Sequence, residues 1–328
     1  MRLLSAEDVR QAVPMAAAID AVEAAFISLA AGEADVPLRT HIAAPTHAGM
    51  SLFMPARINA PAAPALGMKV VSIFPHNLGL GPPTINALVN LFDPTTGQPV
   101  AVVDGTYLTA LRTGAASGVA TRYLARADAR VLALFGAGAQ ALPQALAVCA
   151  VRPIERIWLV NRSRERAQLL AARMRGAGLT LDLRIAPSVA QALAEADVVC
   201  TATSASTPLF DDAMLKAGTH INAIGAYKPT MAEVPGATVA RARVFVDQTA
   251  AAWAEAGDLI QAREAGLISS EHLAGEIGSV AAGLLAGRRD TEAITLFKSV
   301  GNAAQDLAVA SLALARANEL GLGVVWAN

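Results

Sequence analysis

A glycine-containing segment in the middle of the chain has the residue types needed to bind a pyrophosphate. Gly136-Ala-Gly138-Ala-Gln-Ala141 has the spacing GxGxxA; the apolar segment Arg130–Phe135 precedes it directly, and a helix is expected over Ala139–Val151. The first glycine permits a tight turn, the second lets the backbone approach the phosphates, and the alanine allows close packing of helix on strand. Free N–H groups and the helix dipole favour the negative charge. The segment therefore predicts a dinucleotide-binding loop.

The end of the next expected strand, Arg156–Val160, indicates which dinucleotide would bind. Asn161 and Arg162 follow this strand, close to the spacing of roughly 20 residues at which the ribose-reading residue is expected after the glycines. A carboxylate there would accept the 2′-hydroxyl of NAD, whereas an arginine forms charge-assisted hydrogen bonds with a 2′-phosphate. We therefore predict NADPH as the cofactor, with NADH less favoured. The alternative is that Arg162 is a solvated residue at the start of a helix.

Two cations in the N-terminal third stand in apolar surroundings, where a charge without a partner is costly. Lys69 lies in Met68-Lys-Val-Val71, and Arg112 lies in Leu108-Thr-Ala-Leu-Arg-Thr-Gly114, on an otherwise apolar and small helix face. Arginine binds a carboxylate through two parallel N–H donors. The two positions predict either a ligand's carboxylate or a structural ion pair. Asp306, on the final helix, offers a balancing charge, although a plain helix-surface role is open for it.

The elements that must position these residues fall into two groups. After Asp128 the apolar pattern alternates between strands and helices, which predicts a doubly wound parallel sheet. We expect its strands at 130–135, 156–160, 181–185, 197–203, 219–224 and 244–247, and its helices at 139–151, 164–175 and 189–196. Before Asp128 we expect helices at 5–31 and 109–125, strands at 51–55, 67–74, 87–93 and 99–104, and a turn at 93–97. A long amphipathic helix is expected over 301–320.

Composition excludes several classes of protein. The 328 residues carry 26 Lys+Arg and 27 Asp+Glu, so no basic field for nucleic acid is present. The uncharged segment Val131–Val151 contains glycine, proline and glutamine, which favours a buried strand and helix over a membrane span. No apolar signal-peptide core follows the N-terminus, so we expect a cytoplasmic protein. Two distant cysteines predict no disulfide or zinc site, and no metal is expected because the histidines lack ligand spacing: His41, His47, His220 and His272.

The sequence resembles the ornithine cyclodeaminase/mu-crystallin family over almost its whole length. The resemblance rests on an ordered series of blocks. They are Met54-Pro55, Gly67-Met-Lys69-Val, Phe74-Pro-His-Asn77, Pro83-Thr84, Leu108-Thr-Ala-Leu-Arg112-Thr113, the loop at Gly136, Glu255-Ala-Gly-Asp258, and Phe297-Lys-Ser299-Val-Gly301 with Asp306. It implies a homodimer whose Rossmann-type α/β domain, 116–301, is inserted into a discontinuous α+β substrate and dimerisation domain, 1–115 plus 302–328.

The resemblance also implies which side chains form the site. Arg39, Lys69 and Arg112 would face a substrate carboxylate, with Tyr227 and Val300 on the substrate side. Lys69, Arg112 and His76 are the candidate catalytic residues, and His76 is a candidate proton donor with solvent as the alternative source. The predicted cofactor-binding residues are Thr84, Arg112, Gly136, Gly138, Ala139, Gln140, Asn161, Arg162, Ser163, Thr203, Ala223, Ile224, Gly225 and Ser299.

One departure from the family's cyclodeaminases bears on the reaction. Where those enzymes have an Asp that handles the amino group, this chain reads Ile224-Gly-Ala-Tyr227-Lys-Pro229. A phenol, with a reference pKa near 10, is a poor substitute for a carboxylate base. We therefore expect an NADPH-dependent reductase that converts Δ1-pyrroline-2-carboxylate or its six-membered homologue to L-proline or L-pipecolate. The alternatives are an NADP-linked alanine dehydrogenase, an ornithine cyclodeaminase, and a non-catalytic binder of NADPH and a ligand.

Overall fold

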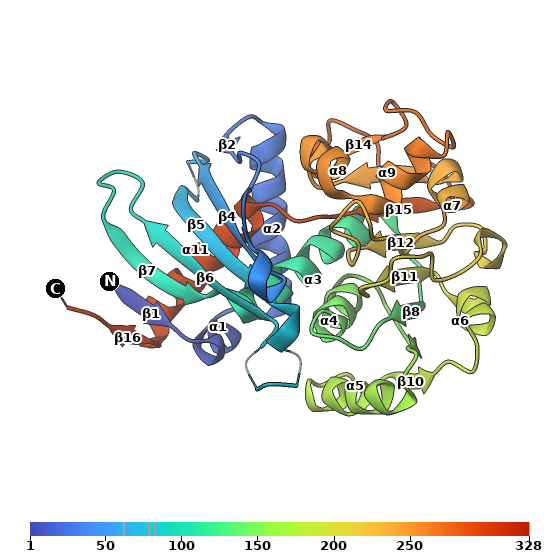
Figure 1. Ribbon diagram of the computed structural model, residues 1–328, viewed down its shortest axis with the longest axis horizontal. Coiled ribbons are helices and arrows are strands. Elements are labelled where there is room, and N and C mark those ends of the chain that lie inside the picture. Colours follow the sequence, from blue (N-terminus) through green and yellow to red (C-terminus); the bar gives the residue numbers. More distant parts are fainter. Residues whose placement is uncertain (62, 78, 82, 328) are drawn as a thin grey trace. The chain divides into compact units, whose positions relative to one another are not determined.

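The computed structural model describes residues 1–61, 63–77, 79–81 and 83–327. Contacts within the chain divide it into two compact units (Figure 1). Unit 1 comprises Met1–Arg112 and Asn302–Asn328, and unit 2 comprises Thr113–Gly301. The first boundary falls inside helix α3 (Gly105–Leu124), one helical turn before the expected boundary at 115/116.

Unit 1 is built on a mixed sheet whose strand order is β16-β1-β7-β6-β5-β4-β2, with β3 paired to β4. The neighbouring strands β4 to β7 are antiparallel, and β1 is parallel to β7. At the expected turn, the Asp93 carboxylate accepts hydrogen bonds from the backbone of Thr95 and Thr96, which confirms the hairpin. The strands are β1 (Arg2–Leu4), β2 (Ala34–Asp35), β3 (Thr40–Ala44), β4 (Gly49–Ile58), β5 (Ala65–Ile73), β6 (Ile85–Phe92), β7 (Pro99–Asp104) and β16 (Val324–Val325).

The helices of unit 1 correct one expectation. The helix predicted over 5–31 is two helices, α1 (Ala6–Ala12) and α2 (Met15–Ala30), bent by 89°. Pro14 stands at the break, because proline donates no backbone hydrogen bond and its ring clashes with the preceding turn. The Ser5–Asp8 capping box at the start of α1 is confirmed.

Helices pack on one face of the unit 1 sheet, and the opposite face carries exposed apolar residues. Helix α11 (Ala303–Leu320) packs on α2 and across β4, β5 and β6. The alternation of the strands points Val71, Val89 and Leu91 into this core. On the opposite side of the same strands Leu88 is 52% exposed. Phe53 and Val70 pair with Leu88 across β4, β5 and β6 and lie on this same side.

Unit 2 has a second sheet, in which every pairing is parallel. Its order is β10-β9-β8-β11-β12-β15-β13-β14, so the Rossmann-type doubly wound sheet that the sequence predicts is present. The strands are β8 (Val131–Phe135), β9 (Arg156–Val160), β10 (Asp182–Ile185), β11 (Val198–Thr201), β12 (His220–Ala223), β13 (Arg243–Val246), β14 (Gly275–Glu276) and β15 (Thr295–Lys298). Strand β15, which lies between β12 and β13, is not among the strands predicted from the sequence.

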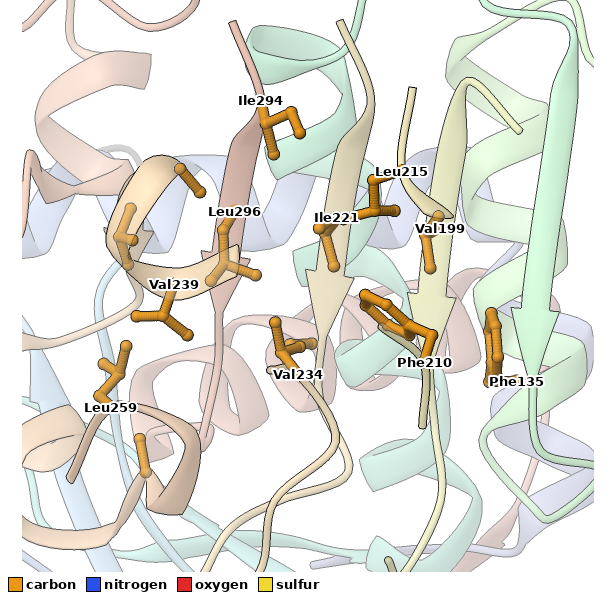
Figure 2. Packing of buried hydrophobic residues seen from close by; sticks show 14 of the residues in the cluster. Phe135, Val199, Phe210, Leu215, Ile221, Val234, Val239, Leu259, Ile294 and Leu296 are labelled. Carbon is orange, nitrogen blue, oxygen red and sulfur yellow. The ribbon is translucent and has the colours of Figure 1, made fainter. Parts of the chain in front are cut away.

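Helices and apolar side chains cover this sheet. Figure 2 shows one core layer, where Phe135, Val199 and Ile221 of three strands face Phe210 and Val234. The helices of unit 2 are α4 (Ala141–Val151), α5 (Arg164–Gly176), α6 (Val189–Glu195), α7 (Gly236–Arg241), α8 (Thr249–Glu255), α9 (Gly257–Glu264) and α10 (Ile277–Ala281). The three short 3₁₀ turns of the described chain are η1 (Pro45–His47) and η2 (Pro75–Asn77) in unit 1, and η3 (Asp212–Met214) in unit 2.

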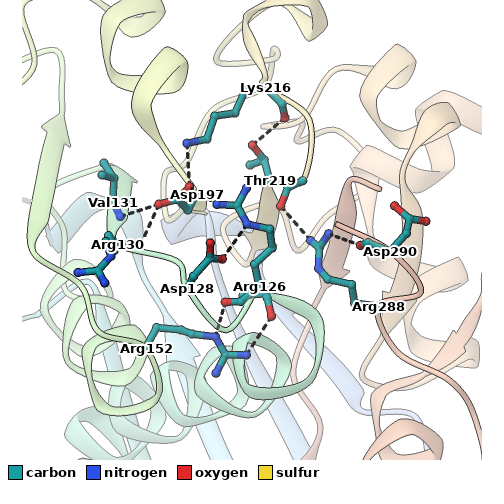
Figure 3. A network of polar contacts seen from close by, with 12 residues as sticks. Arg126, Asp128, Arg130, Val131, Arg152, Asp197, Lys216, Thr219, Arg288 and Asp290 are labelled. Carbon is teal, nitrogen blue, oxygen red and sulfur yellow. Dashed lines mark hydrogen bonds and ion pairs between the residues drawn. The ribbon is translucent and has the colours of Figure 1, made fainter. Parts of the chain in front are cut away.

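A polar network fixes the last turn of α3 (Figure 3). The Arg152 guanidinium donates to the carbonyls of Arg122, Ala125 and Arg126, and Arg288 donates to that of Leu124. The carbonyls of Arg122 and Leu124 belong to the last turn of the helix, and those of Ala125 and Arg126 follow it directly. The two cations therefore stabilise the negative end of the helix.

Among the described helices, none is by itself long and apolar enough to cross a membrane. By length and composition alone, the bent pair α1 and α2 meets that criterion when both helices are taken together.

Candidate active site

Two cations and one carboxylate form a buried cluster in unit 1, which we call the cation cluster: Lys69, Arg112 and Asp306. Nζ of Lys69 lies 2.7 Å from Oδ2 of Asp306, and Nε of Arg112 donates to Oδ1 of the same carboxylate at 3.0 Å. Lys69 is 1% exposed and Asp306 is 0% exposed. Strand β5, helix α3 and helix α11 supply one member each. The buried Lys69 therefore has the carboxylate partner that its apolar strand required.

The cluster retains donors that its own members do not use. Nη1 of Arg112 donates to Oε1 of Gln305 at 2.8 Å, which also orients the Gln305 amide. In the part of the chain that the structure describes, Nη2 of Arg112 has no acceptor, and neither has the buried Nε2 of Gln305. One carboxylate therefore balances two cations, which leaves a positive charge and unused N–H groups for an anionic ligand.

Burial changes the acidity of Lys69. It lowers the pKa of the ammonium from its ordinary value to about 7; the charges of Arg112 and Arg39 lower it as well, whereas Asp306 acts in the opposite direction. Arg39 is half-buried between β2 and β3, close enough for its charge to act on Lys69. Lys69 is therefore a group whose charge changes near neutral pH.

Two other predicted residues of unit 1 lie outside this cluster. His76 is exposed in η2, and no hydrogen bond or ion pair joins it to another described residue. Thr84 is half-buried just before β6, where its carbonyl accepts from the backbone N–H of Phe74. A cavity of about 640 Å³ also lies in unit 1, next to Asp93 and Leu314, and none of the predicted site residues lines it.

The glycine loop of unit 2 has the geometry of a phosphate cradle. Gly136 has φ +101°, and a Cβ there would lie 2.5 Å from the carbonyl oxygen of Ala202, so only glycine fits. At Gly138, by contrast, a Cβ would meet nothing within 4 Å, so that side of the backbone is open. No described residue accepts a hydrogen bond from the amides of Gly138, Ala139 or Gln140, which precede α4. These open, unused N–H groups fit the pyrophosphate of a dinucleotide.

The residues after β9 lie at the start of α5. The side chain of Asn161 donates to the carbonyl of Ser163 at 2.8 Å, and Ser163 caps α5 by accepting from the Arg166 N–H. Arg162 between them is exposed, and its guanidinium has no hydrogen-bond or ion-pair partner among the described residues. It is thus available to a phosphate.

A second buried cluster stands at the carboxyl ends of the unit 2 strands, and we call it the strand-end cluster: Glu233, Asp258 and Lys298. Oε1 of Glu233 accepts from the N–H and the hydroxyl of Thr203, and Oε2 accepts from Thr201 Oγ1 and the N–H groups of Gly225 and Ala226. Thr203 and Gly225, two predicted cofactor residues, are therefore brought together by one carboxylate. Burial raises the pKa of Glu233, and the charge of Lys298 opposes that effect.

The other two members link this carboxylate to the rest of unit 2. Oδ1 of Asp258 accepts from the N–H groups of Glu233 and Val234, at 2.6 and 3.0 Å. Oδ2 of Asp258 lies 2.8 Å from Nζ of Lys298, and both side chains are 0% exposed. Apart from this ion pair, neither atom has a partner among the described residues.

The remaining predicted residues lie around these strand ends. Ser299 donates to Oδ2 of Asp247 at 2.7 Å, and Ala223 and Ile224 are buried at the end of β12. Tyr227 is half-buried next to Lys228, whose Nζ lies 5.6 Å from the centre of the Tyr227 ring. Val300 is buried in the hydrophobic core of unit 2 rather than in a polar setting.

Glu233 is not among the site residues predicted from the sequence, and Lys298 appears there only as part of a family block. The signal that revealed Lys69 was present at Lys298 too, because a lysine in the apolar segment Leu296-Phe-Lys298 also needs a carboxylate partner. Glu233 stands in Met231-Ala-Glu-Val234, where an acidic residue between apolar ones indicates burial.

Comparisons with known proteins place the chain among nicotinamide-dependent enzymes. The profile of the ornithine cyclodeaminase/mu-crystallin family matches residues 1–320. A Δ1-pyrroline-2-carboxylate reductase of Bacillus cereus is 39% identical over 98% of each chain. The structure of a Thermococcus litoralis Δ1-pyrroline-2-carboxylate reductase in complex with NADH and L-proline has a TM-score of 0.94, with 39% identity over 99% of this chain and all of that one.

An archaeal alanine dehydrogenase dimer with bound NAD is also similar, with a TM-score of 0.91 and 34% identity over 99% of this chain and 98% of that one. A profile match over nearly the full length, together with relatives that are aligned from end to end, goes well beyond a shared fold. The chain belongs to the ornithine cyclodeaminase/mu-crystallin family.

Proposed function

We propose that this chain is a nicotinamide-dependent reductase of cyclic imino acids, which converts Δ1-pyrroline-2-carboxylate or its six-membered homologue to L-proline or L-pipecolate. The observation that carries the proposal is the cation cluster. Two buried cations share one carboxylate, so a small carboxylic acid supplies the missing negative charge. The imine reductases among the relatives act on a substrate of this kind.

Carboxylate binding, the hydride and the proton can then each be assigned. The substrate carboxylate binds the free donor of Arg112 and the Lys69 ammonium, with Arg39 adding positive charge, and this fixes the orientation of C2. A bound reduced nicotinamide supplies the hydride that adds to C2 of the C=N bond. The imine nitrogen takes its proton from solvent before binding, since the exposed His76 is not tied to the cation cluster. The balance is one hydride and one proton added across C=N.

For the cofactor we propose NADPH over NADH. Unit 2 offers the open amides of Gly138 and its neighbours to the pyrophosphate, and the exposed guanidinium of Arg162 to a 2′-phosphate. Related structures contain NADH or NAD, so the preference depends on Arg162. The other predicted residues of this unit, Thr203, Gly225 and Ser299 among them, are proposed to line the nicotinamide end.

The second candidate is an open-chain amino-acid dehydrogenase, which the similarity to the archaeal alanine dehydrogenase favours. The cation cluster would bind the carboxylate of a 2-oxo acid in the same way. Cyclodeamination is disfavoured because Tyr227 stands where a carboxylate base is expected.

We further propose that the chain forms a homodimer through the uncovered face of the unit 1 sheet. Phe53, Val70 and Leu88 are paired across β4, β5 and β6, so they form one apolar row on that face. Such a row is typical of a surface that a partner covers. We propose a cytoplasmic location as well, which the free thiols of Cys149 and Cys200 support.

The test is the consumption of reduced cofactor by the purified chain, followed by absorbance. Δ1-Pyrroline-2-carboxylate, Δ1-piperideine-2-carboxylate, and pyruvate with ammonia are supplied in turn, each with NADPH and with NADH. We expect fast oxidation with a cyclic imine and a higher kcat/KM for NADPH. Activity with pyruvate and ammonia alone would select the dehydrogenase, and equal use of both cofactors would overturn the role of Arg162. NADPH that binds but is not consumed with any substrate would indicate a binding protein.

A further inference from the structure

Binding of the nicotinamide half of the cofactor should depend on one part of the unit 2 sheet. In a doubly wound sheet the two halves of a dinucleotide bind on either side of the point where the strand order reverses. Here β8, β9 and β10 form the half that holds the glycine loop and Arg162. The second half, formed by β11, β12 and β15, is therefore the platform for the nicotinamide.

The strand-end cluster joins all three strands of this second half. Glu233 accepts hydrogen bonds from Thr201 and Thr203 at the end of β11 and from Gly225 and Ala226 at the end of β12. Lys298, the last residue of β15, reaches Glu233 through Asp258.

The carboxylate form of Glu233 is built into this geometry. Every described group that contacts its two oxygens is an N–H or O–H donor, five in all. A proton on either oxygen would displace one of these donors. The space is also closed, because a Cβ at Gly225 would lie 2.4 Å from Oε1 of Glu233. Neither the position of the carboxylate nor that of the Gly225 backbone has freedom to shift.

The backbone around Glu233 is anchored as firmly as its side chain. Val234 lies in the hydrophobic core beside Phe210 (Figure 2), and Leu259, one residue after Asp258, belongs to the same core. At Gly257 a Cβ would lie 2.0 Å from the carbonyl oxygen of Met231, so helix α9 begins in direct contact with the segment before Glu233. Core packing therefore holds the cluster from behind.

We propose that Glu233 is a positioning residue for the nicotinamide half of the cofactor, and that the Asp258–Lys298 pair holds it in place. Glu233 fixes the ends of β11 and β12, and through them the backbone of Thr203 and Gly225. The inference rests on the proposed cofactor. We also infer that the adenosine half binds independently of this cluster, because that half binds at the ends of β8, β9 and β10.

The test compares two ligands on the variant Glu233→Gln. A glutamine keeps the shape but turns one acceptor into a donor, which then faces the donors of Thr203 or Gly225. We expect the dissociation constant of NADPH, measured by its fluorescence, to rise about 10-fold or more, as an unsatisfied buried pair implies. The dissociation constant of 2′,5′-ADP, which lacks the nicotinamide, should stay within about 2-fold.

Two further variants keep the result interpretable. Glu195→Gln is the matched control, because Glu195 also accepts hydrogen bonds in unit 2, from Trp158 and Arg156, but lies on α6. This variant should leave the dissociation constants of both ligands unchanged. If Glu233→Gln does not fold, Thr201→Val can replace it, because it removes one hydrogen-bond donor from the same carboxylate and adds none. The loss of this one hydrogen bond should raise the dissociation constant of NADPH about 3-fold.

If Glu233→Gln weakens the binding of NADPH and of 2′,5′-ADP equally, or changes the binding of neither, the positioning role is overturned. Failure of the wild-type chain to bind either ligand would instead overturn the proposed cofactor, so the two failures are distinct.

Discussion

Each unit buries one cluster of three charged side chains, and the two clusters have opposite composition. In unit 1, Lys69 and Arg112 share the single carboxylate of Asp306. In unit 2, Glu233 and Asp258 stand with the single cation Lys298. The surplus charge of the first cluster is positive, and part of its donor capacity is unused. The surplus charge of the second cluster is negative, and its carboxylate oxygens accept hydrogen bonds from backbone N–H groups and hydroxyls.

This difference separates two uses of buried charge. Charge that the protein itself leaves unbalanced is available to a ligand, which fits the proposed substrate carboxylate at Lys69 and Arg112. Charge that the protein satisfies with its own backbone fixes the shape of a site instead, as at Glu233. Variants of the two clusters should therefore differ in which property they change, stability or ligand affinity, and in which ligand is affected.

The largest expected effect is on stability, from Asp306→Asn. The change leaves two buried cations without a counter-charge, and loss of one partner of a buried ion pair costs about 3–5 kcal/mol. We expect the free energy of unfolding, measured by urea with circular dichroism, to fall by about 5 kcal/mol. Asp258→Asn removes the partner of one cation and keeps an oxygen for the two N–H groups, so about 3 kcal/mol is expected.

The control for both is Asp35→Asn, which breaks an exposed ion pair with Arg57 on β4. It should change the free energy of unfolding by less than about 1 kcal/mol. A loss from Asp306→Asn no greater than that of this control would show that the cation cluster does not need its carboxylate, and the comparison would lose its basis.

The next effect is on substrate binding, from Arg112→Lys. A lysine keeps the charge but loses the planar pair of donors, so one amine must serve Asp306, Gln305 and the substrate. We expect kcat/KM for the cyclic imine to fall about 100-fold, as the loss of a charge-assisted bidentate contact implies. We expect the dissociation constant of NADPH to rise by much less than this factor, although Arg112 is also a predicted cofactor-binding residue. The surface variant Arg57→Lys is the matched control. An equal loss of NADPH affinity would mean that the two units do not divide the ligands as proposed.

The two clusters also differ in how much of each could be predicted from the sequence. Lys69 was identifiable because a single charge in an apolar strand needs a partner, and the phosphate loop because glycine spacing encodes backbone geometry. The bend at Pro14 was missed because an apolar period continued across it, although proline makes such a break predictable.

Glu233 was harder to identify for a physical reason. Three of its five partners are backbone N–H groups of residues that lie 7 to 30 positions away in the chain, and every residue type except proline carries that donor. Only the topology of β11 and β12 brings those groups together. Strand β15 was missed for a related reason, because its lysine is tolerated in a central strand only through Asp258, which a local pattern does not reveal.

A smaller effect is expected from Arg162→Ala in unit 2. Loss of one exposed charge-assisted contact to a 2′-phosphate should raise the KM of NADPH about 10-fold and leave that of NADH unchanged. The KM of the imine should not move, because the cation cluster is intact. Arg173→Ala, in the last turn of helix α5, which begins two residues after Arg162, controls for loss of surface charge. A change in imine KM as large as that of NADPH would contradict the division of ligands between the clusters.

The smallest effect is a change in pH dependence, from Lys69→Arg. The pKa of Lys69 is lowered to about 7, so its positive charge is present below pH 7 and is lost as the pH rises through 7. An arginine stays charged throughout. In kcat/KM, which reports the free enzyme, the ratio of variant to wild type should therefore rise with pH from 7 to 9. The protonation of the imine itself cancels in this ratio. A ratio that stays flat would mean that substrate binding does not use the Lys69 charge.

The same group should influence the stability of the wild type. Because its pKa is lowered in the folded state, the unfolded chain binds more protons between pH 7 and the ordinary lysine pKa near 10.4. The contribution of Lys69 to the free energy of unfolding therefore increases with pH over that window, and Lys69→Met should remove this slope. Glu233 offers the contrast, because burial raises its pKa. The folded chain then binds more protons at this group than the unfolded chain, so its contribution to the free energy of unfolding falls as the pH rises. Urea unfolding from pH 7 to 9.5 on wild type and Lys69→Met would detect the slope, and identical slopes would assign the titration to another group.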